Sequence, residues 1–345
     1  MRSSAPSPIC QCFSPRGTPS PARTGCHGAA RVTGDSCPRI MAPAEPGSAM
    51  ESYAHPEFLI SPQELHARLG EPGLVVLDVT TTLVAAKDKP FAPLSGEAEF
   101  LKSHVPGARY VDLERDLSVP VKGLLFTLPP LEDFARMAAS LGIGRDSFVV
   151  VYSTAQPGWA ARVWLMLRAF GFTNAAVLNG GFADWKAAGL PVKAGAVPPA
   201  TPPLEEFAWR PADKRVFVDT RAVNKALDDG SSQLVNALPP DVFRGDSLIV
   251  YGRPGHIPQS INVPTGTLVD PETGRYLDPA SLERRFTDAG IDPDTSVIAY
   301  CGAGVAASNV AFARLLLGHE KVSVYDGSML DWSRDPLRPV VTGEK

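Results

Sequence analysis

The chain has 345 residues, of which 44% are hydrophobic and 20% are charged, and its formal net charge is −4. This composition is typical of a folded globular protein long enough for two ordinary domains, and the mild negative charge gives no electrostatic reason to expect nucleic acid as a partner. No apolar run approaches the roughly 20 residues that a membrane-spanning helix needs, which argues against an integral membrane protein.

Residues 1–50 differ in composition from the rest of the chain. Ser, Pro, Gly and Arg dominate them, and their first acidic residue is Asp35. We interpret this segment as a disordered tail, or as a mis-assigned extension that precedes the real start at Met41 or Met50. The alternative is a transit peptide within residues 1–40, which would make the protein mitochondrial. Otherwise we expect a cytoplasmic protein, because a lone unpaired cysteine in the folded body suits a reducing compartment.

The folded body contains two copies of one pattern. Each copy has an apolar run ending in aspartate, a turn beginning with histidine, a second apolar run and a segment ending in tryptophan. The members are 74–78, His104, 148–152 and Trp185 in the first copy, and 216–219, His256, 297–300 and Trp332 in the second. This reading pairs Asp78 with Asp219.

Short apolar runs that alternate with helical patterns are expected of strands buried in a mainly parallel sheet with helices on both faces. We therefore expect an α/β protein with two tandem domains, at residues 51–193 and 204–345. Residues 194–203 contain four prolines and no periodicity, which is typical of a linker.

Cys301 is the only cysteine in the folded body, and its neighbours indicate a reactive thiol. It follows the apolar run 297–300 and precedes Gly302 and Gly304, after which a helical pattern runs to Leu317. A glycine loop at a helix N-terminus presents backbone N–H groups that favour the thiolate over the thiol. The alternative is a buried structural cysteine. The first copy carries Ser153 at the matching position, so we expect catalysis in the second copy alone.

The other four cysteines lie in the first forty residues, so a disulfide framework within the folded body is excluded. Their spacing does not match a paired zinc site, and we expect no metal.

This arrangement resembles the tandem rhodanese-like sulfurtransferases, the thiosulfate and 3-mercaptopyruvate sulfurtransferases, over roughly residues 57–341. The matching segments keep their order and spacing in both halves; they are 104–108, 162–164, 178–182, 255–258, 301–305 and 325–328. The resemblance implies two rhodanese-like domains, the first without a catalytic cysteine.

The resemblance also implies a persulfide mechanism, in which the Cys301 thiolate takes the outer sulfur of thiosulfate or 3-mercaptopyruvate and passes it to cyanide, a thiol or a protein. The backbone N–H groups of the loop would cradle that sulfur; its residues are Gly302, Ala303, Gly304, Val305 and Ala306. The implied partners are a small-molecule donor and acceptor, and no cofactor is implied. The oligomeric state stays undetermined.

The loop departs from both branches of the family. Thiosulfate-type members resemble Cys-Arg-Lys-Gly-Val-Thr and mercaptopyruvate-type members resemble Cys-Gly-Ser-Gly-Val-Thr, whereas this chain lacks both the cations and the hydroxyls. Val242 also replaces an arginine that binds the pyruvate carboxylate. Substrate-binding candidates are Arg244 and Arg253, which would supply positive charge, and His104, which matches the family's histidine. The alternatives are surface arginines and a turn-fixing histidine, and the donor stays open.

Two other functions compete with sulfur transfer as interpretations of the sequence. A cysteine phosphatase or arsenate reductase on the same fold needs an arginine six residues after the cysteine, and position 307 is alanine. The other alternative is a catalytically weak rhodanese-like module for sulfur relay or binding, its site weakened by Ala303 and Ala306. The retained Cys301 favours transfer.

Overall fold

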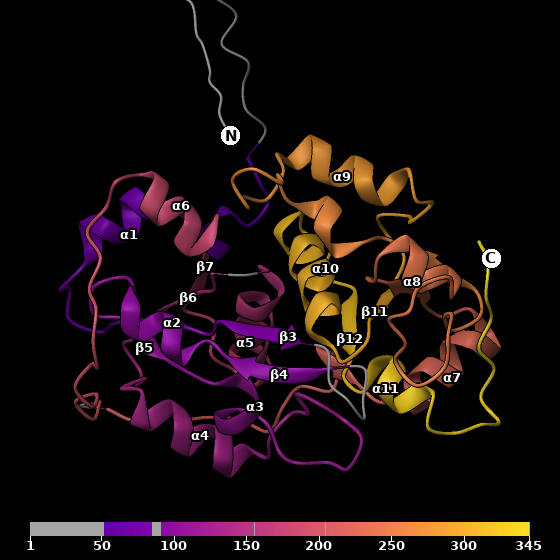
Figure 1. The fold of residues 1–345 in the computed structure, drawn as a ribbon, viewed down its shortest axis with the longest axis horizontal. Coiled ribbons are helices and arrows are strands. Elements are labelled where there is room, and N and C mark those ends of the chain that lie inside the picture. Colours follow the sequence, from indigo (N-terminus) through magenta and orange to yellow (C-terminus); the bar gives the residue numbers. More distant parts are fainter. Residues whose placement is uncertain (1–51, 85–90, 155, 204, 345) are drawn as a thin grey trace, which may run out of the picture. The chain divides into compact units, whose positions relative to one another are not determined.

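The computed structural model describes residues 52–84, 91–154, 156–203 and 205–344 (Figure 1). The chain divides into two units, Met1–Ala49 and Met50–Lys345. The N-terminal extension and the alternative transit peptide fall outside the described residues. Within the described ranges, no helix is both long enough and apolar enough to cross a membrane.

The first half contains a five-stranded sheet, parallel throughout, in the order β1-β7-β6-β2-β5. Its strands are β1 Leu59–Ile60, β2 Leu74–Asp78, β5 Arg109–Tyr110, β6 Phe148–Tyr152 and β7 Ala175–Leu178. Alternate residues of β2 enter different hydrophobic clusters, Val75 and Leu77 in one and Val76 in the other, so both faces of the sheet are buried. A hairpin of β3 Thr81–Val84 and β4 Ala92–Ser95 is separate from the sheet.

The helices of this half are η1 Pro56–Phe58, α1 Pro62–Arg68, α2 Glu97–Lys102, α3 Leu113–Asp116, α4 Leu131–Ser140, α5 Gly158–Ala169 and α6 Gly181–Ala187.

The second half contains an equivalent parallel sheet in the order β10-β9-β11-β12-β8. Its strands are β8 Phe217–Val218, β9 Gln233–Asn236, β10 Ser260–Asn262, β11 Val297–Tyr300 and β12 Val322–Tyr325. Its helices are α7 Thr220–Asp229, α8 Pro240–Arg244, η2 Thr265–Leu268, α9 Pro279–Thr287, α10 Val305–Leu316 and α11 Ser328–Trp332. The predicted fold class, two mainly parallel sheets with flanking helices, is confirmed.

The alignment of the two copies differs from the one predicted. Compared strand by strand, β1 corresponds to β8 and β2 corresponds to β9. Asp78 at the end of β2 therefore matches Asn236, whereas Asp219 matches Ser61; Ser61 and Asp219 are the N-cap residues of α1 and α7. The predicted pairing of Asp78 with Asp219 is wrong, because two apolar runs that end in a polar residue look alike until strand order is known.

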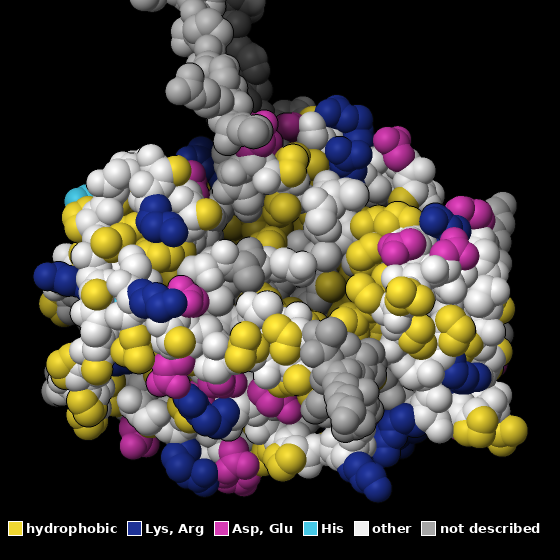
Figure 2. All heavy atoms as spheres, in the orientation of Figure 1, with side chains coloured by type: hydrophobic (Ala, Val, Ile, Leu, Met, Phe, Trp, Pro, Cys, Tyr) yellow, Lys and Arg dark blue, Asp and Glu magenta, His cyan; other side chains and the backbone are white. Residues whose placement is uncertain are grey.

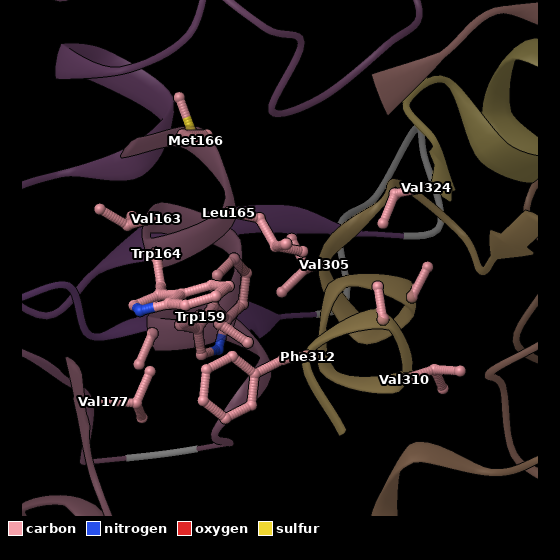
Figure 3. Close-up of a cluster of buried hydrophobic side chains, with 14 of the residues drawn as sticks. Trp159, Val163, Trp164, Leu165, Met166, Val177, Val305, Val310, Phe312 and Val324 are labelled. Atoms are coloured by element: carbon pink, nitrogen blue, oxygen red, sulfur yellow. The ribbon is translucent and has the colours of Figure 1, made fainter. Parts of the chain in front are cut away.

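Helices α5 and α10 lie side by side and join the two halves through one hydrophobic core (Figures 1 and 3). Gly158 begins α5, and a Cβ atom added there would lie 3.0 Å from the carbonyl oxygen of Val305. Glycine therefore permits this close approach. The rings of Trp164 and Phe312 meet edge to face, with centroids 4.9 Å apart. Since Val305 begins α10, this packing fixes the end of the helix that follows Cys301.

Candidate active site

Cys301 lies at the carboxyl end of β11, the central strand of the second sheet. It is a free cysteine with a relative exposure of 3%. Three residues separate it from α10, whose N-cap residue Gly304 has φ 80. The strand, glycine loop and helix therefore follow one another as the sequence predicts. Parallel α/β sheets bind their ligands at this end of the strands.

The backbone of Cys301 is held by the segment that begins α11. Its N–H donates to Ser328 Oγ at 3.1 Å, and that hydroxyl donates to the carbonyl oxygen of Tyr325 at 2.8 Å. The N–H of Met329 donates to the carbonyl oxygen of Cys301 at 3.0 Å. Ser328 adopts a left-handed backbone with φ 49, which is uncommon for a residue other than glycine. Ser328 thus positions the cysteine from a strained conformation.

The loop offers unpaired donors around the sulfur. Among the described residues, none accepts a hydrogen bond from the backbone N–H groups of residues 302–306. Helix α10 begins without a side-chain cap. Unpaired N–H groups and the helix dipole together carry partial positive charge, which stabilises an anion.

Tyr251 packs directly against the loop. A Cβ atom added to Gly302 would lie 2.0 Å from Tyr251 Cε1, so this position needs glycine. The Tyr251 ring also contacts the ring of Phe91 from the first half, with centroids 4.9 Å apart. Burial, and then the negative charge of Cys301, raise the pKa of Tyr251, so its hydroxyl stays protonated. Sequence reasoning missed Tyr251, although the glycine after the cysteine was a signal that something packs closely there.

A buried arginine of the first half approaches the same loop from α5. The side chain of Arg162 is 0% exposed, and its Nη2 donates to Asp326 Oδ1 and to the carbonyl oxygen of Phe126. Its Nη1 lies 3.1 Å from the position that a Cβ on Gly304 would occupy. Nη1 and Nε have no hydrogen-bond partner within the described structure. The sequence marked Arg162 only as part of a matching segment.

The two arginines named as substrate-binding candidates are engaged elsewhere. Arg244 Nε lies 2.8 Å from Asp246 Oδ2, and its Nη1 lies 3.5 Å from Glu344 Oε1. Arg253 Nη2 donates to carbonyl oxygens of the C-terminal segment, those of Asp335 at 3.1 Å and Arg338 at 2.8 Å. In the described structure, neither guanidinium forms a hydrogen bond or ion pair with residues 301–306.

His104 is 2% exposed and belongs to a hydrophobic cluster of the first half. Its Nδ1–H donates to the carbonyl oxygen of Phe100 at 2.7 Å, and its ring stacks on Phe100. His256 makes the same pair of contacts with Phe243, at 2.8 Å. Both geometries match a histidine that fixes a turn, and in the described structure no hydrogen bond or ring contact joins His104 to residues 301–306.

The model of the rhodanese-like domain matches residues 61–188 and 219–335, one stretch in each half. The chain belongs to the rhodanese-like sulfurtransferase family. This match confirms the predicted family, and the relatives described next confirm the prediction of a sulfurtransferase enzyme.

Relatives of this sulfurtransferase are named for both donors. It is 35% identical over 299 residues to a probable 3-mercaptopyruvate sulfurtransferase of Pseudomonas aeruginosa, covering 83% of this chain and 98% of the relative. It is 32% identical over 319 residues to a thiosulfate sulfurtransferase of Corynebacterium glutamicum, covering 88% and 97%. The crystal structure of SseA from Escherichia coli, a 3-mercaptopyruvate sulfotransferase, matches with a TM-score of 0.69 and 29% identity, covering 79% of this chain and 98% of that one.

Proposed function

We propose that this enzyme moves a sulfane sulfur from a donor to a thiophilic acceptor through a persulfide on Cys301. The observation that carries the proposal is the position of Cys301: a free cysteine at the carboxyl end of a central strand, followed by open backbone N–H groups and the N-terminus of α10. These donors suit first a thiolate and then the outer sulfur that it accepts.

Each half-reaction transfers one sulfur atom. With thiosulfate, the thiolate attacks the outer sulfur, the new S–S bond forms on Cys301, and the old S–S bond breaks to release sulfite with its electron pair. With 3-mercaptopyruvate, the C–S bond breaks and its electron pair takes a proton to form pyruvate. Cyanide then attacks the outer sulfur and leaves as thiocyanate, which returns the thiolate. A thiol or a protein thiol attacks the same sulfur.

Three residues would share the work of positioning. Ser328 holds the Cys301 N–H and Met329 holds its carbonyl, so the sulfur starts from one backbone geometry. Arg162 places a positive charge beside Gly304, where charge on the persulfide would develop. Its partner Asp326 keeps the guanidinium in place.

The test is intact-mass spectrometry of the purified full chain after incubation with each donor, followed by peptide mapping. We expect a gain of one sulfur atom on Cys301, its loss on adding cyanide, and an equal amount of thiocyanate. Peptide mapping separates Cys301 from the four cysteines of the N-terminal extension. Turnover that persists in Cys301→Ser, or sulfur that accumulates elsewhere, contradicts the proposal. A Cys301 persulfide that no small thiophile discharges would favour the relay module instead.

A further inference from the structure

An apolar pocket adjoins the cysteine loop between the two halves. Its volume is ≈ 360 Å³, which falls in the range of small-ligand sites. Its walls come from both halves: Phe91, Gly123, Leu124, Leu125, Gly252, Leu330, Ser333 and Arg334. Gly252 follows Tyr251 in the chain, and the N–H of Leu330 donates to the carbonyl oxygen of Gly302 at 3.0 Å. The pocket therefore begins next to the loop that carries Cys301.

The described walls of this pocket carry little charge. Arg334 is the only ionisable side chain among them, and it is exposed. Arg162 is paired with Asp326 in the interior. Arg244 is paired with Asp246 and Glu344, and Arg253 donates to carbonyl oxygens of the C-terminal segment. Gly302 and Ala303 add no cation to the loop. Within the described residues, the approach to Cys301 has no pair of free cations to hold a dianion or a carboxylate.

Aromatic and aliphatic side chains, instead of cations, lie near the cysteine loop. Tyr251 lies between the loop and Phe91, and the segment that leads to it exposes Leu248 and Ile249 to solvent. In Figure 2, hydrophobic side chains gather over the region where Figure 1 places α8. An apolar approach to a reactive sulfur binds an apolar group by burying its surface.

We infer that the preferred sulfur donor is an organic persulfide with an apolar substituent, and that Tyr251 is the specificity-determining residue that selects it. The inference rests on the proposed persulfide function of Cys301. The substituent lies in the pocket against Phe91, whose ring contacts Tyr251, and the donor's terminal sulfur lies toward Cys301. The thiolate attacks that sulfur, the new S–S bond forms on Cys301, and the donor's own S–S bond breaks. The donor leaves as its thiolate, so atoms and electrons balance without an added oxidant.

The experiment compares two donors that differ only in a remote charge, benzyl persulfide and para-carboxybenzyl persulfide. We measure kcat/KM for each, together with persulfide loading of Cys301 by mass spectrometry. Because moving a carboxylate from water into an apolar pocket is unfavourable, we expect the wild type to prefer the neutral donor by about tenfold or more. Tyr251→Arg, which puts a cation over the loop, should reverse the preference. Tyr251→Phe keeps the ring and should preserve it.

Two outcomes would overturn the inference. One is equal kcat/KM for the two donors in the wild type. The other is a preference for the charged donor that disappears in Arg334→Ala, because the pocket would then select by charge. In both cases Cys301 is still loaded, so the proposed function survives. If neither donor, nor thiosulfate, nor 3-mercaptopyruvate loads Cys301, the proposed function itself fails. A circular dichroism spectrum like that of the wild type shows that a variant is folded, so its altered donor preference is not caused by unfolding.

Discussion

In the first half Ser153 follows the central strand β6, and its hydroxyl donates to the carbonyl oxygen of Gln156 at 2.8 Å. In the second half Cys301 follows the equivalent strand β11, and a three-residue loop leads at once into α10. The serine is therefore hydrogen-bonded within its own loop, while the loop after the cysteine leaves its N–H groups open. The two halves thus have one framework but different chemistry at one position.

The shared framework extends to individual hydrogen bonds. Tyr152 Oη accepts the N–H of Val105 at 3.2 Å, and Tyr300 Oη accepts the N–H of Ile257 at 3.0 Å. The two tryptophans each donate to a proline carbonyl oxygen at 2.8 Å, Trp185 to Pro191 and Trp332 to Pro339. Since these bonds survive in both copies, they hold the fold and are not specific to catalysis.

The differences lie next to Cys301. Gly181 and Ser328 both begin the last helix of their half, in left-handed conformations with φ 58 and φ 49. A Cβ on Gly181 would lie 2.4 Å from the carbonyl oxygen of Ser153. The second half accepts a side chain at this point, and its hydroxyl holds Cys301. The two halves therefore differ in the supports of this residue as well as in the residue itself.

The largest expected effect comes from exchanging the two residues at this position. Cys301→Ser should abolish sulfur transfer, because an oxygen nucleophile does not form a persulfide. Ser153→Cys should add no second active site, because the next N–H, that of Thr154, already donates to Thr80 Oγ1 and Gly181 has no side chain to hold the backbone at position 153. Thiocyanate production from thiosulfate and cyanide measures both variants. If the double variant that combines Ser153→Cys with Cys301→Ser carries sulfur at position 153 and turns over, the shared framework alone is sufficient for sulfur transfer.

The next effect separates two arginines that both reach from α5 into the second half. Arg162 is 0% exposed beside Asp326, which is 23% exposed, whereas Arg168 and Glu320 are 26% and 52% exposed. Arg162→Met should lower the free energy of unfolding by about 3 kcal/mol, because it leaves the partly buried carboxylate of Asp326 without its cation. Arg168→Met should cost about 0.5 kcal/mol. Urea denaturation compares them.

A second measurement separates a role of Arg162 at the cysteine loop from its effect on stability. If its charge assists the loop, persulfide loading of Cys301 by thiosulfate should be slower in Arg162→Met than in the wild type, while Arg168→Met keeps the wild-type rate. Equal loading rates for all three proteins would leave Arg162 with a purely structural role.

A smaller effect is expected at the left-handed position of each half. Gly181→Ala should cost about 1–3 kcal/mol, because the added methyl meets the carbonyl oxygen of Ser153 in a conformation that favours glycine. Ser328→Gly relieves the same strain but removes the acceptor of the Cys301 N–H, so its net cost should be about 1 kcal/mol. Urea denaturation gives both values. Ser328→Gly should also slow persulfide formation, which Gly181→Ala leaves unchanged; the reverse pattern would contradict a positioning role for Ser328.

The smallest effect is a pH dependence of stability from His256. Burial lowers the pKa of His256 below its ordinary 6.5, so the unfolded chain takes up the proton first as the pH falls. The contribution of neutral His256 is present above about pH 6.5 and is lost below it, by at most about 1.4 kcal/mol per pH unit. His256→Asn keeps a donor for the Phe243 carbonyl and does not titrate. The unfolding free energy of His256→Asn should depend less on pH than that of the wild type between roughly pH 5 and 6.5, the range in which a histidine titrates. If the pH dependence is the same in both proteins, it comes from other groups.

Much of the fold could be predicted because it depends on local pattern. The apolar runs at 148–152 and 297–300 became the central strands, and the glycines after Cys301 marked a tight turn into a helix. A strand, a glycine loop and a helix are encoded within about twenty consecutive residues, where periodicity and turn residues are informative. The proposed nucleophile, Cys301, could therefore be named from its own neighbours.

The sequence by itself determined two parallel α/β halves, a cysteine loop in the second and the family to which they belong. Only the tertiary structure decided which distant residues surround that loop: Tyr251 and Phe91 over it, Arg162 beside it and Ser328 beneath its backbone. It also decided that Asp78 matches Asn236, and that Arg244 and Arg253 bind the C-terminal segment. The reason is that burial patterns show which residues lie inside, whereas strand order and helix packing decide which of them meet.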